Sequence, residues 1–307
     1  MRLLRPLALA ALLALLSACS GTTFVYNRLH ILVPWYLGGY VDLDPGQRHS
    51  LDQQLAPYLD WHRRDELPRH IDLLDRAEAL LDGEVEPADI AALQGEVEVA
   101  AGRLRDRALD WLLPLAERLG DRQIADFLAA LADKQEEYRE KYLDRDDVRY
   151  HRDAFESLRD NGQDYLGRLS GEQRDGLQAA AQRLRRADAA WLAEREAWIA
   201  TLGEILAREP GWQQRLRDAV AARDSRYARE HRALYDHNLA VIHGAIAELL
   251  NSRNERQDRH LRRELHNLRR DLATLAGCDP RAQGEPARCR GAGSGDAGVG
   301  IGESGAG

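Results

Sequence analysis

The sequence predicts an all-α protein, built as an elongated or bundled array of about eight helices. Apolar residues recur three and four positions apart almost everywhere from Asp44 to Ala276, which is the period of an amphipathic helix. No stretch alternates with the period of two that a half-buried strand requires. The chain of 307 residues is 31% charged and 44% hydrophobic, too apolar for a disordered chain and too charged for a bundle embedded in lipid.

The N-terminus has the layout of an export signal. Arg2 and Arg5 precede an apolar run over residues 6–16 that is too short to span a bilayer. Leu16-Ser17-Ala18-Cys19 follows and resembles a bacterial lipobox. The resemblance implies a signal peptide over residues 1–18, cleavage before Cys19, and acylation of the Cys19 thiol and of the new α-amine. The alternative is an ordinary cleaved signal peptide that happens to contain a cysteine.

The lipobox resemblance also implies a location. Ser20 follows Cys19, and in enterobacterial lipoproteins an Asp at that place favours retention in the inner membrane. We therefore expect a lipid-anchored protein of the outer membrane that faces the periplasm. Its first partner would be the membrane itself, contacted through the N-terminal lipid.

Residues 19–42 form an apolar and aromatic segment, and no charge occurs between Ile31 and Val41. Either this segment packs into the core, or it lies in the lipid interface, where Trp35 and Tyr36 would suit the headgroup region. Pro34 and the two glycines at 38 and 39 interrupt a long amphipathic helix, which favours the core.

Residues 43–276 form the predicted helical domain. Asp82-Gly83, Leu119-Gly120, Ser170-Gly171 and Pro210-Gly211 mark helix boundaries, and the prolines at 57, 68 and 114 should kink or split helices. The clearest periodic run is Leu177, Ala180, Leu184, Ala187, Trp191, Trp198, Leu202 and Ile205.

Four helix starts carry a glutamine in the first turn. They lead to Gln47, Gln123, Gln173 and, in a weaker copy, Gln257. Asp44 and Ser170 precede their glutamines by three residues, as in a capping box, whereas Gly120 has that place before Gln123.

Residues 277–307 form a Gly-rich tail that cannot bury a core, and we expect it to be disordered. With Cys19 lipidated, Cys278 and Cys289 remain as a pair. An oxidising periplasm favours a disulfide between them; otherwise they are two thiols in a loose tail.

The densest polar and aromatic stretch runs from Trp61 to His70. His62, Glu66 and His70 are four residues apart, so one helical face could present a metal site or an acid–base pair. Pro68 should turn the chain and move His70 away. The simpler interpretation is a helix end with Trp61 in the core and Arg63 paired with Glu66. A further alternative is a partner-binding surface, with candidate residues Trp61, His62, Arg63, Arg64 and Glu66.

The rest of the sequence marks no catalytic residue, metal site or cofactor. Histidines six residues apart, such as His231 and His237, do not share a helix face. A formal net charge of -8 disfavours nucleic acid as a partner. The Arg-rich stretch 253–270 could contact an anionic glycolipid, although its intervening acids are equally consistent with a solvated face.

Several motifs together resemble a family of proteobacterial lipoproteins of unknown function, over residues 1 to about 275. They are the lipobox, Tyr26-Asn27, Tyr40-Val41-Asp42-Leu43 with Gln47, and Trp61-His62-Arg63-Arg64 followed by Glu66-Leu67-Pro68. The resemblance implies a helical periplasmic fold with no established activity. The glutamine-bearing starts also resemble the LTxxQ motif of small periplasmic stress chaperones, but this chain is longer and has Asp, Gly or Ser in place of the Thr.

We therefore expect a non-enzymatic binding or scaffolding protein of the envelope, whose partner would be an envelope protein or an anionic glycolipid. The competing hypotheses are an LTxxQ-like chaperone or stress sensor, and an enzyme acting on glycans, which would need paired carboxylates in a cleft. The sequence does not predict the oligomeric state.

Overall fold

The computed structural model describes residues 21–278, and within this range the chain is helical throughout, with short connections and no strand. The all-α prediction is confirmed. The expected number of about eight helices is wrong, because the described part contains eleven. The elements are α2 (Gly21–Tyr26), α3 (Leu29–Leu37), α4 (Pro45–Trp61), the π-helical turn η2 (His62–Glu66), α5 (Leu67–Leu80), α6 (Pro87–Glu117), α7 (Asp121–Leu143), α8 (Asp147–Leu166), α9 (Gly171–Arg183), α10 (Asp188–Ile205), α11 (Trp212–Asn251) and α12 (Glu255–Ala276).

One additional helix boundary lies inside the run that looked most continuous, between α9 and α10. The backbone of Leu184 is extended there, with ψ 138°. Asn238 of α11 accepts a hydrogen bond from the Arg185 N–H (2.9 Å) and donates one to the Arg185 carbonyl (2.8 Å). A side chain from a distant helix thus satisfies the backbone groups that the break exposes, and the local spacing could not reveal it.

Prolines affect the helices less than expected. Pro57 and Pro114 lie inside α4 and α6 and do not split them. Pro68 occupies the first turn of α5, where its missing N–H costs no helical hydrogen bond.

At all four glutamine-bearing helix starts, the glutamine side chain caps the first turn by accepting a hydrogen bond from the N-cap N–H. Reciprocal capping boxes form at Asp44 with Gln47, at Ser170 with Gln173 and at Asn254 with Gln257. Gly120 has no side chain, so its start keeps only half of the box, in which its N–H donates to Gln123 Oε1 at 2.9 Å.

The same glutamines join helix starts far apart in the chain. Gln47 and Gln123 exchange two amide hydrogen bonds, of 2.9 and 2.8 Å. Gln173 and Gln257 exchange two of 3.1 and 2.9 Å. We call these the first and the second glutamine pair. The side-chain amide of each glutamine also donates a hydrogen bond to a backbone carbonyl next to the helix start of the opposite glutamine. Each glutamine side chain is therefore bonded both to its partner glutamine and to the backbone beside that partner.

The helices form two successive units of four with the same order: α4, α5, α6, α7 and then α9, α10, α11, α12. Helix α5 packs on α12 and α10 packs on α7, while α4 packs on α6 and α9 on α11. The glutamine pairs repeat in detail: the first donates to the carbonyls of Asp42 and Arg118, the second to those of Arg168 and Ser252. The chain therefore contains an internal repeat. The π-helical turn joins the first two helices of the first unit, α4 and α5, and the break at Arg185 joins the first two helices of the second unit, α9 and α10.

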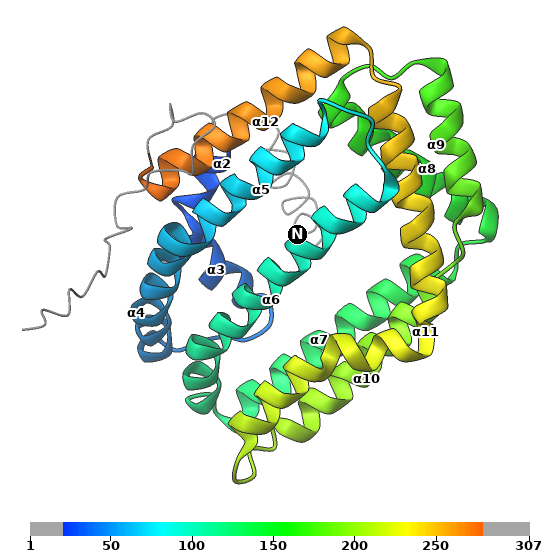
Figure 1. Cartoon of the computed structure of the whole chain (residues 1–307). Coiled ribbons are helices and arrows are strands. Elements are labelled where there is room, and N and C mark those ends of the chain that lie inside the picture. Colours follow the sequence, from blue (N-terminus) through cyan, green and yellow to red (C-terminus); the bar gives the residue numbers. More distant parts are fainter. Residues whose placement is uncertain (1–20, 279–307) are drawn as a thin grey trace, which may run out of the picture.

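The units interleave around two central helices. Figure 1 shows the pair α5–α12 on one side of α6 and the pair α7–α10 on the opposite side. Helices α6 and α11 run antiparallel: His243 Nε2 lies 2.6 Å from Gln94 Oε1 near one end, and Arg217 pairs with Asp110 (3.2 Å) near the other.

The apolar segment before α4 is expected either to pack into the core or to remain free for the lipid interface, and the structure shows it divided between the two. Val33 and Leu37 pack against the core between α4 and α6. Phe24, Ile31, Trp35 and Tyr36 remain exposed by 55%, 57%, 50% and 48%. One face of α2 and α3 thus belongs to the core, and the other is an aromatic surface that the described chain does not cover.

Among the helices of residues 21–278, none combines the length and the apolar character that crossing a bilayer demands.

Candidate functional site

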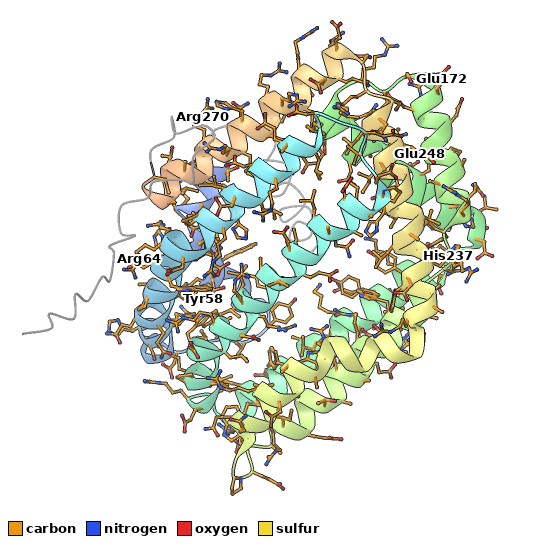
Figure 2. All side chains as sticks on the ribbon, viewed as in Figure 1. Tyr58, Arg64, Glu172, His237, Glu248 and Arg270 are labelled. Carbon is orange, nitrogen blue, oxygen red and sulfur yellow. The ribbon has the colours of Figure 1, made fainter. Side chains whose placement is uncertain are left out.

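The candidate residues from Trp61 to Glu66 lie at a π-helical turn between α4 and α5. A π turn inserts one extra residue into a helix and is common at functional sites. Here it rotates Glu66 into the interior, where its side chain is fully buried. Arg64 and Asp65 remain exposed, and Figure 2 shows Arg64 at the outer edge of the molecule.

Two arginines enclose the buried Glu66 carboxylate. Arg103 of α6 donates to Oε1 at 2.9 Å and to Oε2 at 2.8 Å, and Arg69 of α5 donates to Oε1 at 2.6 Å. These hydrogen bonds, led by those from Arg103, lower the pKa of Glu66 below its ordinary value despite its burial. The expected pair of Arg63 with Glu66 is wrong, because Arg63 points to α2 instead: it donates to Asn27 and lies over the Tyr26 ring.

Pro68 does not move His70 away, which corrects the sequence expectation. The helix continues through the π turn, and the rings of His62 and His70 lie 5.9 Å apart. His62 Nδ1 is 2.6 Å from the Tyr26 hydroxyl. Burial lowers the pKa of His62 to about 4, with a further contribution from His70, and burial also lowers the pKa of His70. Both imidazoles are therefore neutral at pH 7.

The aromatic residues fix this turn against its neighbours. Trp61 is partly buried rather than central to the core, and it packs on Tyr58 (5.7 Å between ring centroids) under the guanidinium of Arg107. Tyr58 also donates to the Leu104 carbonyl of α6 at 3.3 Å. Tyr58 and Arg64 are labelled in Figure 2, on the inner and outer sides of this stretch.

A cavity of about 470 Å³ adjoins the buried carboxylate between α5 and α6. Arg69, His70, Arg76 and Arg103 line it together with Asp72 and Glu96. Arg76 pairs with Glu96 across the opening. Both Glu66 oxygens are engaged by guanidinium groups, so Glu66 cannot act as a general base, and its chemistry is that of a structural anion. Within residues 21–278, no group of three or more His, Cys, Asp or Glu side chains has the arrangement of a metal site.

Tyr26, Arg69 and Arg103 are parts of this cluster that the sequence did not mark. Arg69 follows Glu66 by three residues, a spacing that predicts contact on a helix. Tyr26 and Arg103 are brought in from α2 and α6, and nothing local to the motif identifies them.

The cysteine predictions fall largely outside the described residues. Cys19 and Cys289 both lie there. Cys278 is disulfide-bonded and buried against Leu67 and Ile71 of α5. Its pairing with Cys289 and the lipidation of Cys19 stay predictions.

Acid should destabilise the fold through His62. Its pKa is lower in the folded state than its ordinary value of 6.5, so stability is lost as pH falls from 6.5 towards about 4, where the unfolded chain binds the extra proton. We expect His62→Gln to flatten the dependence of the melting temperature on pH in this window. Substitution of the exposed His49 should leave the slope unchanged; an equal effect of both variants would contradict the assignment.

A protein-family model matches more than half of the chain. It is described as a family of unknown function, DUF6279, and it covers residues 39–232, which include both members of the first glutamine pair, the π-helical turn and Gln173. Comparison with curated proteins found no match, and comparison with solved structures found none either.

Proposed function

Because the chain belongs to this family of unknown function, its membership assigns no activity, and we propose that it is a lipid-anchored binding or scaffolding protein of the bacterial envelope rather than an enzyme. The observation that carries the proposal is the exposed aromatic surface of α2 and α3, which begins directly after the predicted lipidation site.

The position of this surface suits a membrane. Gly21, the first described residue, follows Cys19 by two positions, so a lipid on Cys19 would hold α2 at the bilayer. Trp35 and Tyr36 are amphipathic rings of the kind enriched at the headgroup level. Arg28, whose guanidinium lies 3.4 Å from the centroid of the Phe24 ring, adds a cation beside them for anionic headgroups.

The π-helical turn adjoins this membrane-proximal surface. Tyr26 and Asn27 of α2 contact His62 and Arg63 of the turn. These contacts support a partner-binding role close to the predicted anchor. Arg64, exposed on the outer side of the turn, is the residue best placed to contact a partner without disturbing the buried cluster.

An enzymatic role is less well supported. A hydrolase of glycans needs a carboxyl group that can donate or accept a proton. Glu66, the buried carboxylate at the π-helical turn, is held ionised between Arg69 and Arg103.

A periplasmic chaperone remains the second candidate, and a specific observation favours it. All four glutamine-bearing starts cap helices and pair with one another, so the residues that resemble the LTxxQ motif have one common structural role in this chain. Among the side chains that the structure describes, the exposed large apolar residues outside α2 and α3 are Val97, Val99, Val148 and Tyr165, and they are divided between α6 and α8. Suppression of the aggregation of a denatured test protein would favour the chaperone.

Replacing Cys19 by Ser should abolish anchoring, because the serine hydroxyl is not a substrate for the thioether linkage. We expect unprocessed or soluble protein in cell fractionation and by mass spectrometry. Cys289→Ser, which removes a cysteine outside the lipobox, should remain membrane-bound. Partition of Cys19→Ser into the outer membrane with the mature mass would contradict the anchor.

A further inference from the structure

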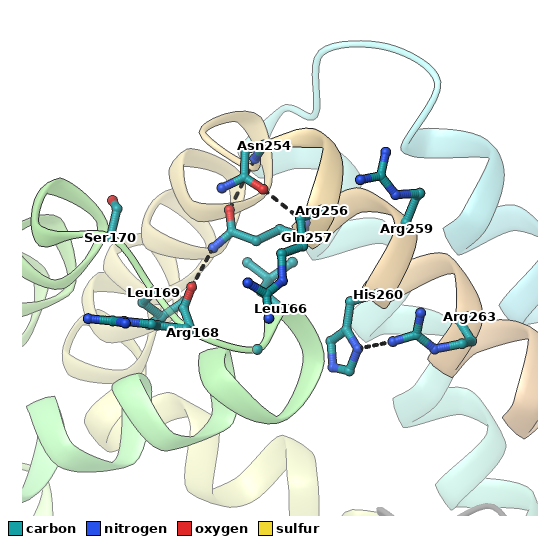
Figure 3. A pocket seen from close by; sticks show the side chains of 11 residues that line it. Leu166, Arg168, Leu169, Ser170, Asn254, Arg256, Gln257, Arg259, His260 and Arg263 are labelled. Atoms are coloured by element: carbon teal, nitrogen blue, oxygen red, sulfur yellow. Dashed lines mark hydrogen bonds between the residues drawn. The ribbon is translucent and has the colours of Figure 1, made fainter.

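A second pocket lies beside the second glutamine pair, far along the chain from the π-helical turn. Its volume is about 510 Å³, and it is lined by the end of α8, the α8–α9 connection and the first turns of α12. Figure 3 shows the side chain of Arg256 over Leu166, with Arg168 to one side and His260 and Arg263 to the other. The charged lining residues are Arg168, Arg256, Arg259 and Arg263, with His260; no carboxylate lines the pocket.

The positive charge of this pocket is only partly balanced. Neither Arg168 nor Arg256 pairs with a carboxylate among the residues that the structure describes. Arg259 pairs with Glu255 at 3.4 Å, and Glu264 lies 3.9 Å from Arg263. Four guanidinium groups against two neighbouring carboxylates leave an excess of two positive charges in a protein whose overall charge is negative.

His260 adds a donor to the same wall. Arg263 donates to His260 Nδ1 at 2.5 Å, as the dashed line in Figure 3 shows. Because Nδ1 accepts this hydrogen bond, the ring proton is on Nε2. That nitrogen faces Gly167, 4.0 Å from the place of a Cβ there, and Gly167 has the positive φ of 71° that turns the chain out of α8.

The internal repeat shows that the fold does not require these cations. The first glutamine pair is built in the same way, yet the residue equivalent to Arg168 is Asp42, whose carbonyl accepts the corresponding amide hydrogen bond. Counting from Gln123 and Gln257, the positions of Arg259, His260 and Arg263 are held by Ala125, Asp126 and Ala129 in α7. Only Arg256 has a basic equivalent, Arg122, and that residue lies 4.0 Å from Asp126.

We propose that this pocket binds the phosphate monoester group of a water-soluble ligand. The excess of two positive charges matches a phosphate dianion better than a carboxylate. Planar guanidinium groups with several N–H donors suit tetrahedral phosphate oxygens, and the His260 Nε2–H adds one more donor. The buried Leu166 and Leu169 form an apolar floor beside the cationic wall, which would contact the uncharged part of the ligand.

The location distinguishes a soluble ligand from a lipid headgroup, and this step alone rests on the proposed anchoring. Tyr26 of α2 packs with Ala273 and Ala276 at the C-terminal end of α12, whereas the pocket lies at the N-terminal end. A helix of 22 residues is about 33 Å long. The pocket therefore lies about one helix length from the end of the molecule next to the predicted anchor, and this separation favours a soluble ligand over a headgroup of the anchoring membrane.

The test measures binding of inorganic phosphate and of glucose 1-phosphate to the purified full-length lipoprotein in non-ionic detergent, by calorimetry at constant ionic strength. Arg256→Glu is the test variant, and Arg122→Glu is the matched control at the equivalent position of the first glutamine pair. We expect Arg256→Glu to weaken binding of both probes by about tenfold or more, because it replaces an unpaired guanidinium by a repelling charge. Arg122→Glu should bind as the original chain does, and both variants should retain their helical circular dichroism.

No binding of either probe, or equal weakening by the two variants, would overturn the proposal. A second arm uses vesicles that contain phosphatidic acid, whose headgroup is a phosphate monoester. Capture of these vesicles that depends on Arg256, without binding of the soluble probes, would assign the pocket to a lipid and overturn the soluble ligand. Loss of membrane partition in Cys19→Ser is measured separately, so failure of the anchor and failure of the pocket give different results.

Discussion

Replacing Glu66 by Gln is expected to lower the free energy of unfolding by about 2–3 kcal/mol, because removal of one partner of a buried ion pair leaves the opposite charge uncompensated. The amide N–H of the new residue would also face guanidinium N–H groups, so that two donors meet. The estimate is below the full cost of a buried pair, since Arg103 and Arg69 are themselves 34% and 53% exposed and water screens them. Urea denaturation at pH 7 measures the change.

The control for Glu66→Gln is Glu137→Gln. Glu137 pairs with Lys134 on the surface of α7, and both side chains are well exposed, so little stability should be lost. The loss of stability at low pH provides a second measurement. The pKa of Glu66 is lowered in the folded state, so its contribution is present above the ordinary carboxyl pKa and is lost as pH falls through the folded value. The difference in the free energy of unfolding between Glu66→Gln and the original protein should therefore become smaller in acid. A difference that does not change with pH would contradict the ion-pair account.

Gln47→Leu is expected to cost about 3 kcal/mol or more, because each buried polar group left without a partner costs about 1–3 kcal/mol. The side chain of Gln47 is buried, caps α4 through Asp44, and donates to both the Arg118 carbonyl (2.7 Å) and Gln123. Leucine has a similar volume, so the effect reports on polar groups rather than on a cavity. Gln173→Leu should cost a similar amount, since the second pair repeats the first.

Gln53→Leu provides the control for both glutamine variants. Gln53 is an exposed residue on the same helix as Gln47 and contacts only His49 of its own helix among the hydrogen bonds found. Its loss should change stability by less than about 0.5 kcal/mol. Chemical denaturation of the three variants, followed by circular dichroism, compares them directly. A loss at Gln47 no greater than that at Gln53 would mean that the glutamine pair does not stabilise the fold.

The sequence predicts what is local in this fold. Capping boxes depend on residues three positions apart, so the spacing alone predicts those of Asp44 with Gln47 and of Ser170 with Gln173. The pairing of those glutamines with each other depends on helix starts distant in the chain, and no single-residue pattern encodes it. The same holds for the candidate site: spacing marks Glu66 and His62, whereas the π turn that buries Glu66 and its partner Arg103 arise from the packing of α5 on α6.

The interleaving of the two units has a consequence for how the chain reaches its native state. Helix α5 is completed by α12, near the far end of the chain, and Arg269 pairs with Asp75, which lies 194 positions earlier in the sequence. The packing of α5 on α12 therefore closes a loop that contains most of the chain, and it must wait until almost the whole polypeptide has been synthesised. Until then the apolar face of α5, with Leu67 and Ile71, has no partner in its own unit. Without α12, the first unit would therefore expose this apolar face, and we expect a chain truncated before α12 to be degraded by proteases rather than to form a stable half-molecule.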